Sequence, residues 1–325
     1  MAIAAVGQIC STASMAHNLE QCRNLMKNAA EKGAKVIFFP EAADYIASSP
    51  EESLSLARTE AESPFVQSLQ AAAQQYNIDV HVGIHVPVPV QPSSSPAGET
   101  SAVATNLATA TTTTTTTATT TTKLLNRTIW ISSSGGIDSS YSYDKIHLFD
   151  FGALRESKHT QAGTSLTPPF DSPVGRIGSL ICFDLRFPEP ALALAHPPSS
   201  SPSSPGRGWL PAHVLTYPSA FTVPTGQAHW ESLLRARAIE SQCWVVAAAQ
   251  VGWHSGEQGR GRVSYGRSMV VDPWGRVKLA LPCVKEEEKT GMVMEQDAIG
   301  ALGLVNIDLA EWEGVRQRMP LIRRS

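Results

Sequence analysis

Three short segments constrain the fold of this chain most. They are residues 36–39, 177–181 and 243–249, which are dominated by apolar side chains and show no polar face. Runs of this length suit strands that are covered on both faces, whereas a half-exposed strand would alternate polar and apolar residues. Helical patterns lie between such runs, and hairpins join others. The sequence therefore predicts an α/β fold with mixed sheets.

The remaining elements follow from periodicity and end signals. Residues 2–9 and 302–307 read as strands, and 78–86 alternates as a half-covered strand. Asn18, with Gln21 three residues on, resembles a capping box for a helix that Gly33 closes. Ser63-Pro64 begins another helix. Residues 226–242 form a helix with four inward side chains: Trp230, Leu233, Leu234 and Ile239.

Three segments interrupt this pattern. Residues 87–125 are rich in Pro, Ser and Thr, 197–208 are rich in Pro and Ser, and 284–298 contain a charged run. Such compositions cannot bury a core, so we interpret them as insertions. No linker separates two complete cores, and we therefore expect residues 1–325 to form a single domain.

Composition narrows the function. The net charge of −3 gives no reason to expect nucleic acid or an anionic membrane as a partner, and no run of about 18 apolar residues exists. The five cysteines are scattered without a CxxC pair. Reduced thiols and a cytoplasmic location are the natural expectation; a mitochondrial location is the alternative, although the N-terminus shows no clear presequence.

A cysteine marks the clearest candidate site. An apolar run delivers Cys182 to a polar turn, and Pro188 then begins a helix. A strand, a sharp turn and a helix with a thiol at the tip can expose a nucleophile and aim backbone amides at its target. A lone cysteine on a strand is more often a buried small hydrophobe, so this reading needs support from elsewhere in the chain.

Glu41 and Lys145 supply that support. Glu41 follows the apolar run 36–39, and Lys145 lies on the second strand of a predicted hairpin. A carboxylate can accept the thiol proton, and an ammonium can stabilise the thiolate and the oxyanion of a tetrahedral intermediate. Taken singly, a glutamate after a strand is usually solvated and a lysine on a strand usually faces water. Together with Cys182 they form a set for acyl transfer.

At these three places the chain resembles the nitrilase/carbon–nitrogen hydrolase superfamily. The resemblance is carried by FFPEA at residues 38–42, YDKIHLFD at 143–150 and ICFDLRFPE at 181–189. It extends through residues 217–221, 228–231, 235–240 and 264–275. Within the superfamily these segments are most similar in sequence to those of the Nit branch, and there to those of the deaminated glutathione amidases.

The resemblance implies a nitrilase-like four-layer α-β-β-α sandwich, usually a homodimer, that needs no cofactor and no metal. It implies a Glu41, Lys145, Cys182 triad that hydrolyses a small-molecule amide through a thioester. The backbone N–H of Phe183 would assist at the oxyanion, and Glu156 matches a second glutamate beside the lysine; a surface carboxylate is the alternative for Glu156. The implied substrate is deaminated glutathione, cleaved to 2-oxoglutarate and cysteinylglycine. The alternatives are an ω-amidase acting on α-ketoglutaramate or another small amide, and a non-catalytic scaffold relative.

Several further residues are candidates for the pocket. Arg186 could bind a substrate carboxylate or pair with Asp184, Glu189 or another acid to brace the turn. The other candidates are Tyr217, Phe221, His229 and Trp230, with core packing as the alternative for the last two. A Cys/His hydrolase with His147 or His229 as base is a second enzyme hypothesis. His81 and His85 lie about 13 Å apart on an extended strand, too far to share a metal.

Overall fold

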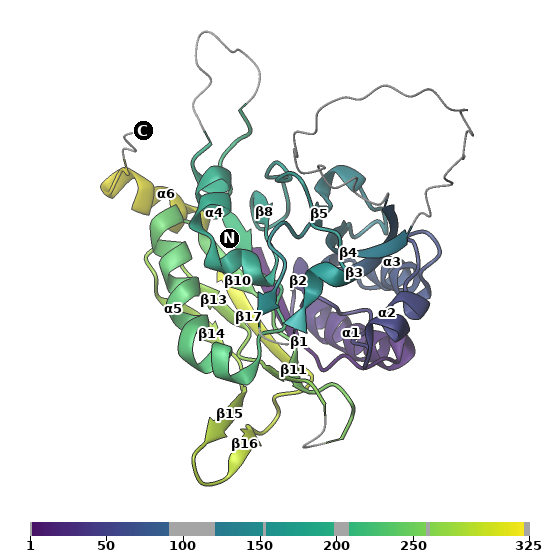
Figure 1. Ribbon diagram of the computed structural model, residues 1–325. Helices are drawn as coiled ribbons and strands as arrows, with labels where there is room; N and C mark the ends of the chain where they lie inside the picture. Colours follow the sequence, from purple (N-terminus) through teal and green to yellow (C-terminus); the bar gives the residue numbers. More distant parts are fainter. Residues whose placement is uncertain (1, 91–120, 152–153, 198–207, 258–260, 322–325) are drawn as a thin grey trace, which may run out of the picture.

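The computed structural model of the chain describes residues 2–90, 121–151, 154–197, 208–257 and 261–321 (Figure 1). Two sheets face each other, and each carries helices on its outer side. This is the predicted four-layer α-β-β-α sandwich with mixed sheets, and the structure confirms it. None of the described helices is long and apolar enough to cross a membrane.

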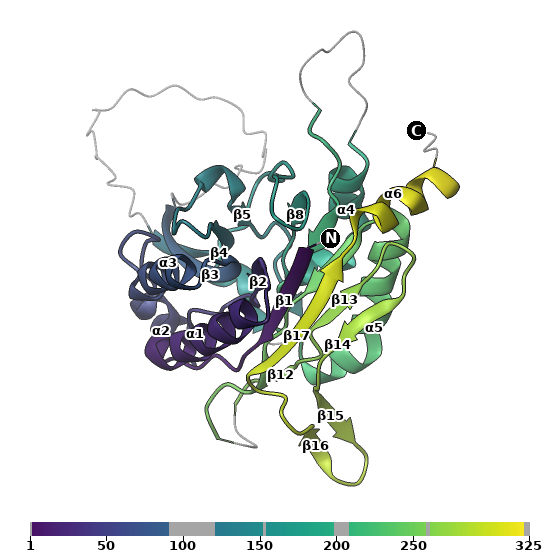
Figure 2. The ribbon, with the colours of Figure 1, turned by 180° about the vertical axis from the view of Figure 1, so that it is seen from behind.

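The first sheet has six strands in the order β17-β1-β2-β3-β4-β5. Their bounds are β1 Ala2–Gln8, β2 Val36–Phe38, β3 Asp79–Val90, β4 Thr121–Ile131, β5 Tyr143–Asp144 and β17 Ala301–Ile307. The β1, β2 and β3 strands are parallel, whereas β17, β4 and β5 join antiparallel. Viewed from behind, β17 and β1 lie side by side although they are the last and the first strand in the sequence (Figure 2).

The second sheet has five strands in the order β14-β13-β10-β9-β8. Their bounds are β8 Ile177–Ser179, β9 Val214–Thr216, β10 Trp244–Ala247, β13 Met269–Val271 and β14 Val277–Ala280. Within this sheet β8, β9 and β10 are parallel, and β8 forms one edge. The carboxyl ends of β2 and β8 lead to Glu41 and Cys182, so the fold brings these residues to one edge of the sandwich.

Three apolar cores hold the layers together. Helices α1 (Met15–Glu31) and α3 (Pro64–Tyr76) cover the first sheet, while α4 (Pro188–Ala195) and α5 (Val223–Ser241) cover the second. Between the sheets, Val6, Phe38, Trp130, Trp244 and Val246 are buried in the third core. Successive residues of a strand point to opposite faces, so the apolar runs 36–39 and 243–249 serve two cores at once.

The remaining elements lie around this sandwich. They are α2 (Pro50–Leu56), α6 (Leu309–Arg318), the pair β6 (Asp150–Phe151) and β7 (Leu154–Arg155), the pair β11 (Val251–Trp253) and β12 (Val263–Tyr265), the pair β15 (Val284–Glu287) and β16 (Gly291–Met294), and three short 3₁₀ helices, η1 (Ser139–Tyr141), η2 (Glu156–Lys158) and η3 (Cys182–Arg186). The charged segment at 284–298 thus contains a hairpin, which projects from the body in Figures 1 and 2.

The structure corrects several sequence predictions. The first helix is capped by Ser14, whose hydroxyl accepts from the His17 amide; the capping box at Asn18 is therefore wrong. Asn18 is buried and bonds to the backbone of Thr12 and Asp44. Ile239 is 43 % exposed rather than inward.

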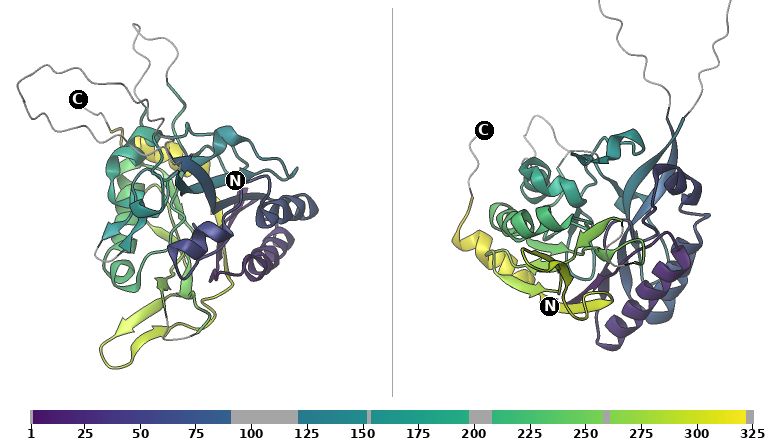
Figure 3. Two further views of the ribbon diagram at one scale, coloured as in Figure 1. Left: turned by 45° about the vertical axis from the view of Figure 1, so that its right-hand side comes forward. Right: turned by 60° about the horizontal axis from the view of Figure 1, so that its bottom comes forward.

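The insertion predicted at 87–125 is narrower than expected. The β3–β4 ladder continues to the pair Val90 and Thr121, so both flanks of that segment belong to one long hairpin (Figure 3). Residues 91–120 and 198–207, which hold the rest of the two low-complexity segments, lie outside the described residues. The strand predicted around Lys145 is also shorter, since Lys145 directly follows the two-residue β5.

Candidate active site

Glu41 lies three residues beyond the end of β2 and is only 4 % exposed. Its backbone passes directly over Gly83 of β3: a Cβ at Gly83 would lie 2.4 Å from the Glu41 Cα and 2.9 Å from the Pro40 carbonyl oxygen. The absence of a side chain at Gly83 therefore lets the Glu41 loop approach the sheet. The next residue, Ala42, has a positive φ of 53°, which turns the chain sharply after the carboxylate.

Two donors fix the carboxylate of Glu41. The Ala220 amide donates to Oε1 at 2.8 Å, and the Asn126 side-chain amide donates to Oε2 at 2.9 Å. Asn126 lies on β4 and also donates to Oε1 of Glu156 at 3.2 Å. One amide group thus positions two carboxylates from separate parts of the chain.

Lys145 lies between those carboxylates. Its Nζ is 2.9 Å from Oε2 of Glu156 and 3.6 Å from Oε2 of Glu41, and the residue is 2 % exposed. Burial lowers the pKa of Lys145, but the charges of Glu156, Glu41 and Cys182 outweigh burial and raise it overall. Burial raises the pKa of Glu156, but Lys145 and the Phe149 amide outweigh that effect and lower it overall. The two carboxylates therefore favour the cationic form of the lysine.

Cys182 begins the 3₁₀ helix η3 at the end of the β8 segment. Its φ is +46°, a conformation uncommon for a side-chain-bearing residue, and its amide donates to the Pro218 carbonyl at 3.0 Å. Phe183 is the second residue of this helix, so its amide lies where a helix start leaves N–H groups without a helical carbonyl partner. This local geometry is the strand–turn–helix predicted from the sequence.

The buried carboxylate of Asp184 holds the turn. It accepts from the Ile181 amide at 3.0 Å, from the Tyr143 hydroxyl at 2.8 Å and from the His147 amide at 3.0 Å, and lies 2.7 Å from His147 Nδ1. Tyr143 and His147 flank Lys145. Asp184 therefore ties the cysteine segment to the lysine segment.

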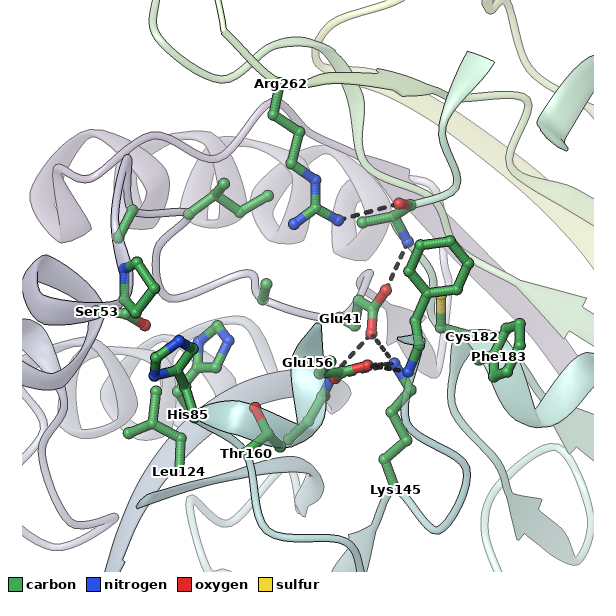
Figure 4. Close-up of a pocket in the computed structure, with 18 of the residues that line it drawn as sticks. Glu41, Ser53, His85, Leu124, Lys145, Glu156, Thr160, Cys182, Phe183 and Arg262 are labelled. Atoms are coloured by element: carbon green, nitrogen blue, oxygen red, sulfur yellow. Dashed lines mark hydrogen bonds and ion pairs between the residues drawn. The ribbon is translucent and has the colours of Figure 1, made fainter. Parts of the chain in front are cut away.

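Glu41, Lys145, Glu156 and Cys182 line one cavity of about 500 Å³, together with Phe183 (Figure 4). This volume falls within the range of small-molecule sites. Burial raises the pKa of the Cys182 thiol, and the negative charge of Glu41 raises it further, against the opposing effect of Lys145. The thiol is therefore protonated before a substrate arrives, and an adjacent base must take its proton.

The structure separates the other pocket candidates. Arg186 and Phe221 line the cavity. Tyr217 and Trp230 do not: both are fully buried in the core behind the second sheet, and Trp230 Nε1 donates to the Arg267 carbonyl at 2.8 Å. His229 is exposed outside the cavity, where its Nδ1 lies 3.0 Å from Nη2 of Arg186. The pocket predictions for Tyr217, His229 and Trp230 are thus wrong: α5 directs His229 and Trp230 away from the cavity, and Tyr217, which follows β9, is buried in the core.

Arg186 also differs from expectation. Within the described residues its guanidinium forms no ion pair with Asp184 or Glu189; it lies 5.8 Å from the Phe183 ring centre and 6.0 Å from that of Phe221. Its charge faces the cavity. His147, the alternative base, is bound to Asp184 and stacked on Phe187 at 3.8 Å, and it does not line the cavity.

Sequence reasoning missed three contributors: Asn126, the Ala220 amide and Arg262. Arg262 lines the cavity and donates to the Ala220 carbonyl at 3.1 Å. An asparagine directly after Leu124 and Leu125 on β4 is a signal that could have been noticed, whereas the backbone amide of Ala220 has no signal in a sequence. Among the described residues, no cluster of three or more His, Cys, Asp or Glu side chains could hold a metal.

The comparisons with known proteins agree with this architecture. A family profile described as carbon-nitrogen hydrolase matches residues 3–317. The chain is 38 % identical to a "Probable hydrolase nit2" of Schizosaccharomyces pombe, covering 100 % of this chain and 98 % of that protein. It is 35 % identical to a deaminated glutathione amidase of Mus musculus, covering 99 % and 82 %.

Two solved structures show the same fold. The Caenorhabditis elegans NitFhit protein superposes with a TM-score of 0.72 at 33 % identity, covering 98 % of this chain and 65 % of that one. Saccharomyces cerevisiae Nit3, a member of branch 10 of the nitrilase superfamily, gives a TM-score of 0.69 at 22 % identity, covering 99 % and 96 %. The fold is therefore that of the nitrilase superfamily. The chain belongs to the carbon–nitrogen hydrolase family and is an amide-hydrolysing enzyme.

Proposed function

We propose that this enzyme hydrolyses deaminated glutathione to 2-oxoglutarate and cysteinylglycine, without a cofactor, through a thioester on Cys182. The observation that carries the mechanism is the meeting of Glu41, Lys145 and Cys182 in one buried cavity. The relatives named deaminated glutathione amidase support the choice of substrate.

Glu41 acts first as a base and then as an acid. It takes the thiol proton as Cys182 Sγ attacks the amide carbonyl, and the tetrahedral intermediate forms. It returns that proton to the nitrogen as the C–N bond breaks and the amine leaves. Water, deprotonated by Glu41, then adds to the thioester, and the thiol is released. The Ala220 and Asn126 donors keep the carboxylate in place during both half-reactions.

Lys145 and the Phe183 amide stabilise the oxyanion. The ammonium is held by Glu156 within the same cavity as the thiol, so its charge needs no rearrangement when the carbonyl oxygen becomes negative. Preorganised charge in a buried site acts more strongly than the same charge in water.

The cavity also suits an acidic substrate. Arg186 and Arg262 line it near Phe183 and Ala220, and Arg155 and Lys158 line it elsewhere. We propose that Arg186 binds the carboxylate of the 2-oxo acid end, because a guanidinium matches a carboxylate geometrically.

The decisive experiment compares substrates and one variant. Purified wild-type protein is assayed with deaminated glutathione, α-ketoglutaramate and a simple nitrile, and Cys182→Ala is assayed with the best of them. We expect deaminated glutathione to give the highest kcat/KM and Cys182→Ala to be inactive but folded. A preference for α-ketoglutaramate would instead assign an ω-amidase, and full activity of Cys182→Ala would eliminate the thioester mechanism and allow a scaffold role.

We also propose a homodimer in the cytoplasm. The candidate surface is α4 with the C-terminal segment: Nη2 of Arg316 on α6 donates to the Ala195 carbonyl of α4 at 2.8 Å, and Met319 and Leu321 beside it are exposed. Elution at dimer size from a sizing column, lost in a Met319→Asp, Leu321→Asp double variant, would support this surface. Elution of the wild type as a monomer would contradict it.

A further inference from the structure

His85 on β3 is a cavity residue that the proposed reaction does not use. Its ring lines the same cavity as the triad, and its side chain is 17 % exposed. In the close-up it lies on the opposite side of Glu41 from Cys182, near Leu124 and Thr160 (Figure 4). The cavity thus continues past Glu41 into an arm that ends at His85 and the first turn of α2.

Asp44 holds this ring in one orientation. Oδ1 of Asp44 lies 3.0 Å from His85 Nδ1, and Oδ2 accepts from the His85 amide at 2.8 Å. The Tyr45 amide donates to Oδ1 at 2.9 Å, and the Tyr45 ring stacks on the imidazole with ring centres 4.6 Å apart. Asp44 itself is 3 % exposed. These contacts fix the orientation of the imidazole ring within the cavity.

The constraint leaves Nε2 as the reactive atom. Nδ1 carries its proton toward Asp44, so Nε2 is the ring nitrogen left to meet a ligand in the cavity that His85 lines. In the neutral ring Nε2 is an acceptor, whereas in the imidazolium it is a donor. Burial lowers the pKa of His85, but the charge of Asp44, aided by Glu41 and Glu156, outweighs burial and raises it. Asp44 therefore favours the protonated form of His85, in which Nε2 can donate into the cavity.

The side of Cys182 on which the amine product leaves indicates which part of the substrate occupies this arm. The leaving amine receives its proton from Glu41, so it departs on the Glu41 side of Cys182. His85 lies on that side (Figure 4), whereas the Arg186 guanidinium lies 5.8 Å from the ring centre of Phe183, the residue next to Cys182. In cysteinylglycine, the only group with full negative charge is the terminal carboxylate. That carboxylate needs a positive partner, because Glu41 and Glu156 already give the arm negative charge.

We propose that protonated His85, oriented by Asp44, binds the terminal carboxylate of the leaving group, so that it selects substrates whose amine product ends in an acid. This assignment rests on the proposed function. His85 is thus a specificity-determining residue that contacts the substrate without taking part in bond making.

Other charged groups face the same arm and define the alternatives. Lys158 and His159 of the η2 segment line it, and Glu51 on α2 interacts with His159. Glu52 is bound to Ser48 at the same helix start, and Asp44, Glu41 and Glu156 complete the acidic groups near the ring. A test must therefore separate His85 from His159 and Lys158.

The experiment uses two substrates that differ at one group: deaminated glutathione and its analogue with the glycine carboxylate replaced by a primary carboxamide. KM and kcat are measured between pH 6 and 9 for the wild type, His85→Gln, His159→Gln and the surface control His17→Gln. We expect the wild type at pH 6.5 to show a KM for the acid about tenfold below that for the amide, with kcat changed by less than about threefold, since one charge-assisted hydrogen bond is involved.

The pattern across pH and variants identifies the residue. As pH rises through the pKa of His85, Nε2 loses its proton and the KM ratio should approach one. His85→Gln should abolish the acid preference at every pH, whereas His159→Gln and His17→Gln should retain it. Asp44→Asn removes the charge that raises the pKa of His85, so it should move the loss of preference to lower pH.

Three outcomes would overturn the inference. An unchanged acid preference in His85→Gln, its loss in His159→Gln instead, or equal KM values for both substrates in the wild type each contradicts a carboxylate contact by His85. In all three the wild type still cleaves deaminated glutathione, so the proposed function stands. Failure of the wild type to cleave either substrate overturns the proposed function together with this inference.

Discussion

The ammonium of Lys145 contacts both oxygens of Glu156, at 3.1 Å and 2.9 Å, although the two residues are 11 positions apart in the sequence. Glu156 also accepts from the Phe149 amide at 2.7 Å and shares Asn126 with Glu41. The second glutamate therefore positions the lysine, and two carboxylates, those of Glu41 and Glu156, lie beside the ammonium of Lys145.

Substituting Glu156 should separate positioning from chemistry. In Glu156→Gln the ammonium keeps Glu41 as its only carboxylate, so Lys145 shifts toward the base and both are misplaced. We expect kcat to fall about 10- to 100-fold, as for residues that orient a reactive group, while KM changes little. Steady-state kinetics measure this, with Glu60→Gln, outside the cavity, as a control. A Glu156→Gln variant with full kcat would show that Glu156 is not needed to position Lys145.

The same carboxylate should influence acid stability. The pKa of Glu156 is lower in the folded protein than its unfolded value of about 4.3. Its stabilising contribution is thus complete above that unfolded value and is lost as pH falls through the folded pKa. The free energy of unfolding from urea titrations should therefore decline below about pH 5, and less steeply in Glu156→Gln. Equal slopes for both proteins would contradict this linkage.

Gly83 should be needed for the position of Glu41. In Gly83→Ala the new Cβ meets the Glu41 Cα and the Pro40 carbonyl, which are backbone atoms that cannot rotate away. We expect kcat/KM to fall at least about 100-fold, because a displacement near 1 Å disrupts catalytic geometry. Gly136→Ala is the control: its nearest neighbour would be the Ser132 hydroxyl at 3.4 Å. Equal activity of the two variants would show that the Glu41 loop adapts freely.

Asp184 should matter for stability as well as activity. Asp184→Ala leaves the Ile181 amide, the Tyr143 hydroxyl and the His147 amide without their buried acceptor. We expect a loss of about 3 kcal/mol in the free energy of unfolding, typical of breaking a buried network. Thermal and urea unfolding measure it, with the exposed Asp150→Ala for comparison. A loss below about 1 kcal/mol would mean that water replaces the carboxylate.

Alkylation of Cys182 should report how the thiol is activated. Because burial and Glu41 raise its pKa, the thiol reacts with iodoacetamide only if Glu41 takes its proton as the bond forms. Glu41→Gln should therefore slow labelling of Cys182 at pH 7.5 at least about 100-fold. Peptide mass spectrometry resolves the five cysteines. Faster labelling in Glu41→Gln would indicate a preformed thiolate, whose pKa falls when the negative charge is removed.

Much of the fold could be predicted, because apolar periodicity and helix-start signals depend on residues that are close together in the sequence. The apolar runs 36–39 and 243–249 became β2 and β10 together with the residues that follow them, and Ser63-Pro64 begins α3 as expected. The errors lie where a tertiary contact overrides a local signal. Ser14 caps the first helix because Asn18 is committed to buried bonds with Thr12 and Asp44. Ile239 fits the helical stripe but lies against Gly275, outside the core.

The sequence by itself determined the types of reactive group and two of the places that hold them, a carboxylate after a strand and a cysteine at a turn; it placed Lys145 on a strand, whereas the structure has it directly after β5. The chemical type of a residue and the periodicity of its neighbours along the chain can both be read directly from the sequence. Only the tertiary structure decided that Asn126 joins Glu41 to Glu156, that Trp230 and Tyr217 pack in the core, and that Asp44 orients His85 in the cavity. These relationships connect residues far apart in the chain, and they exist only after the two sheets have packed together.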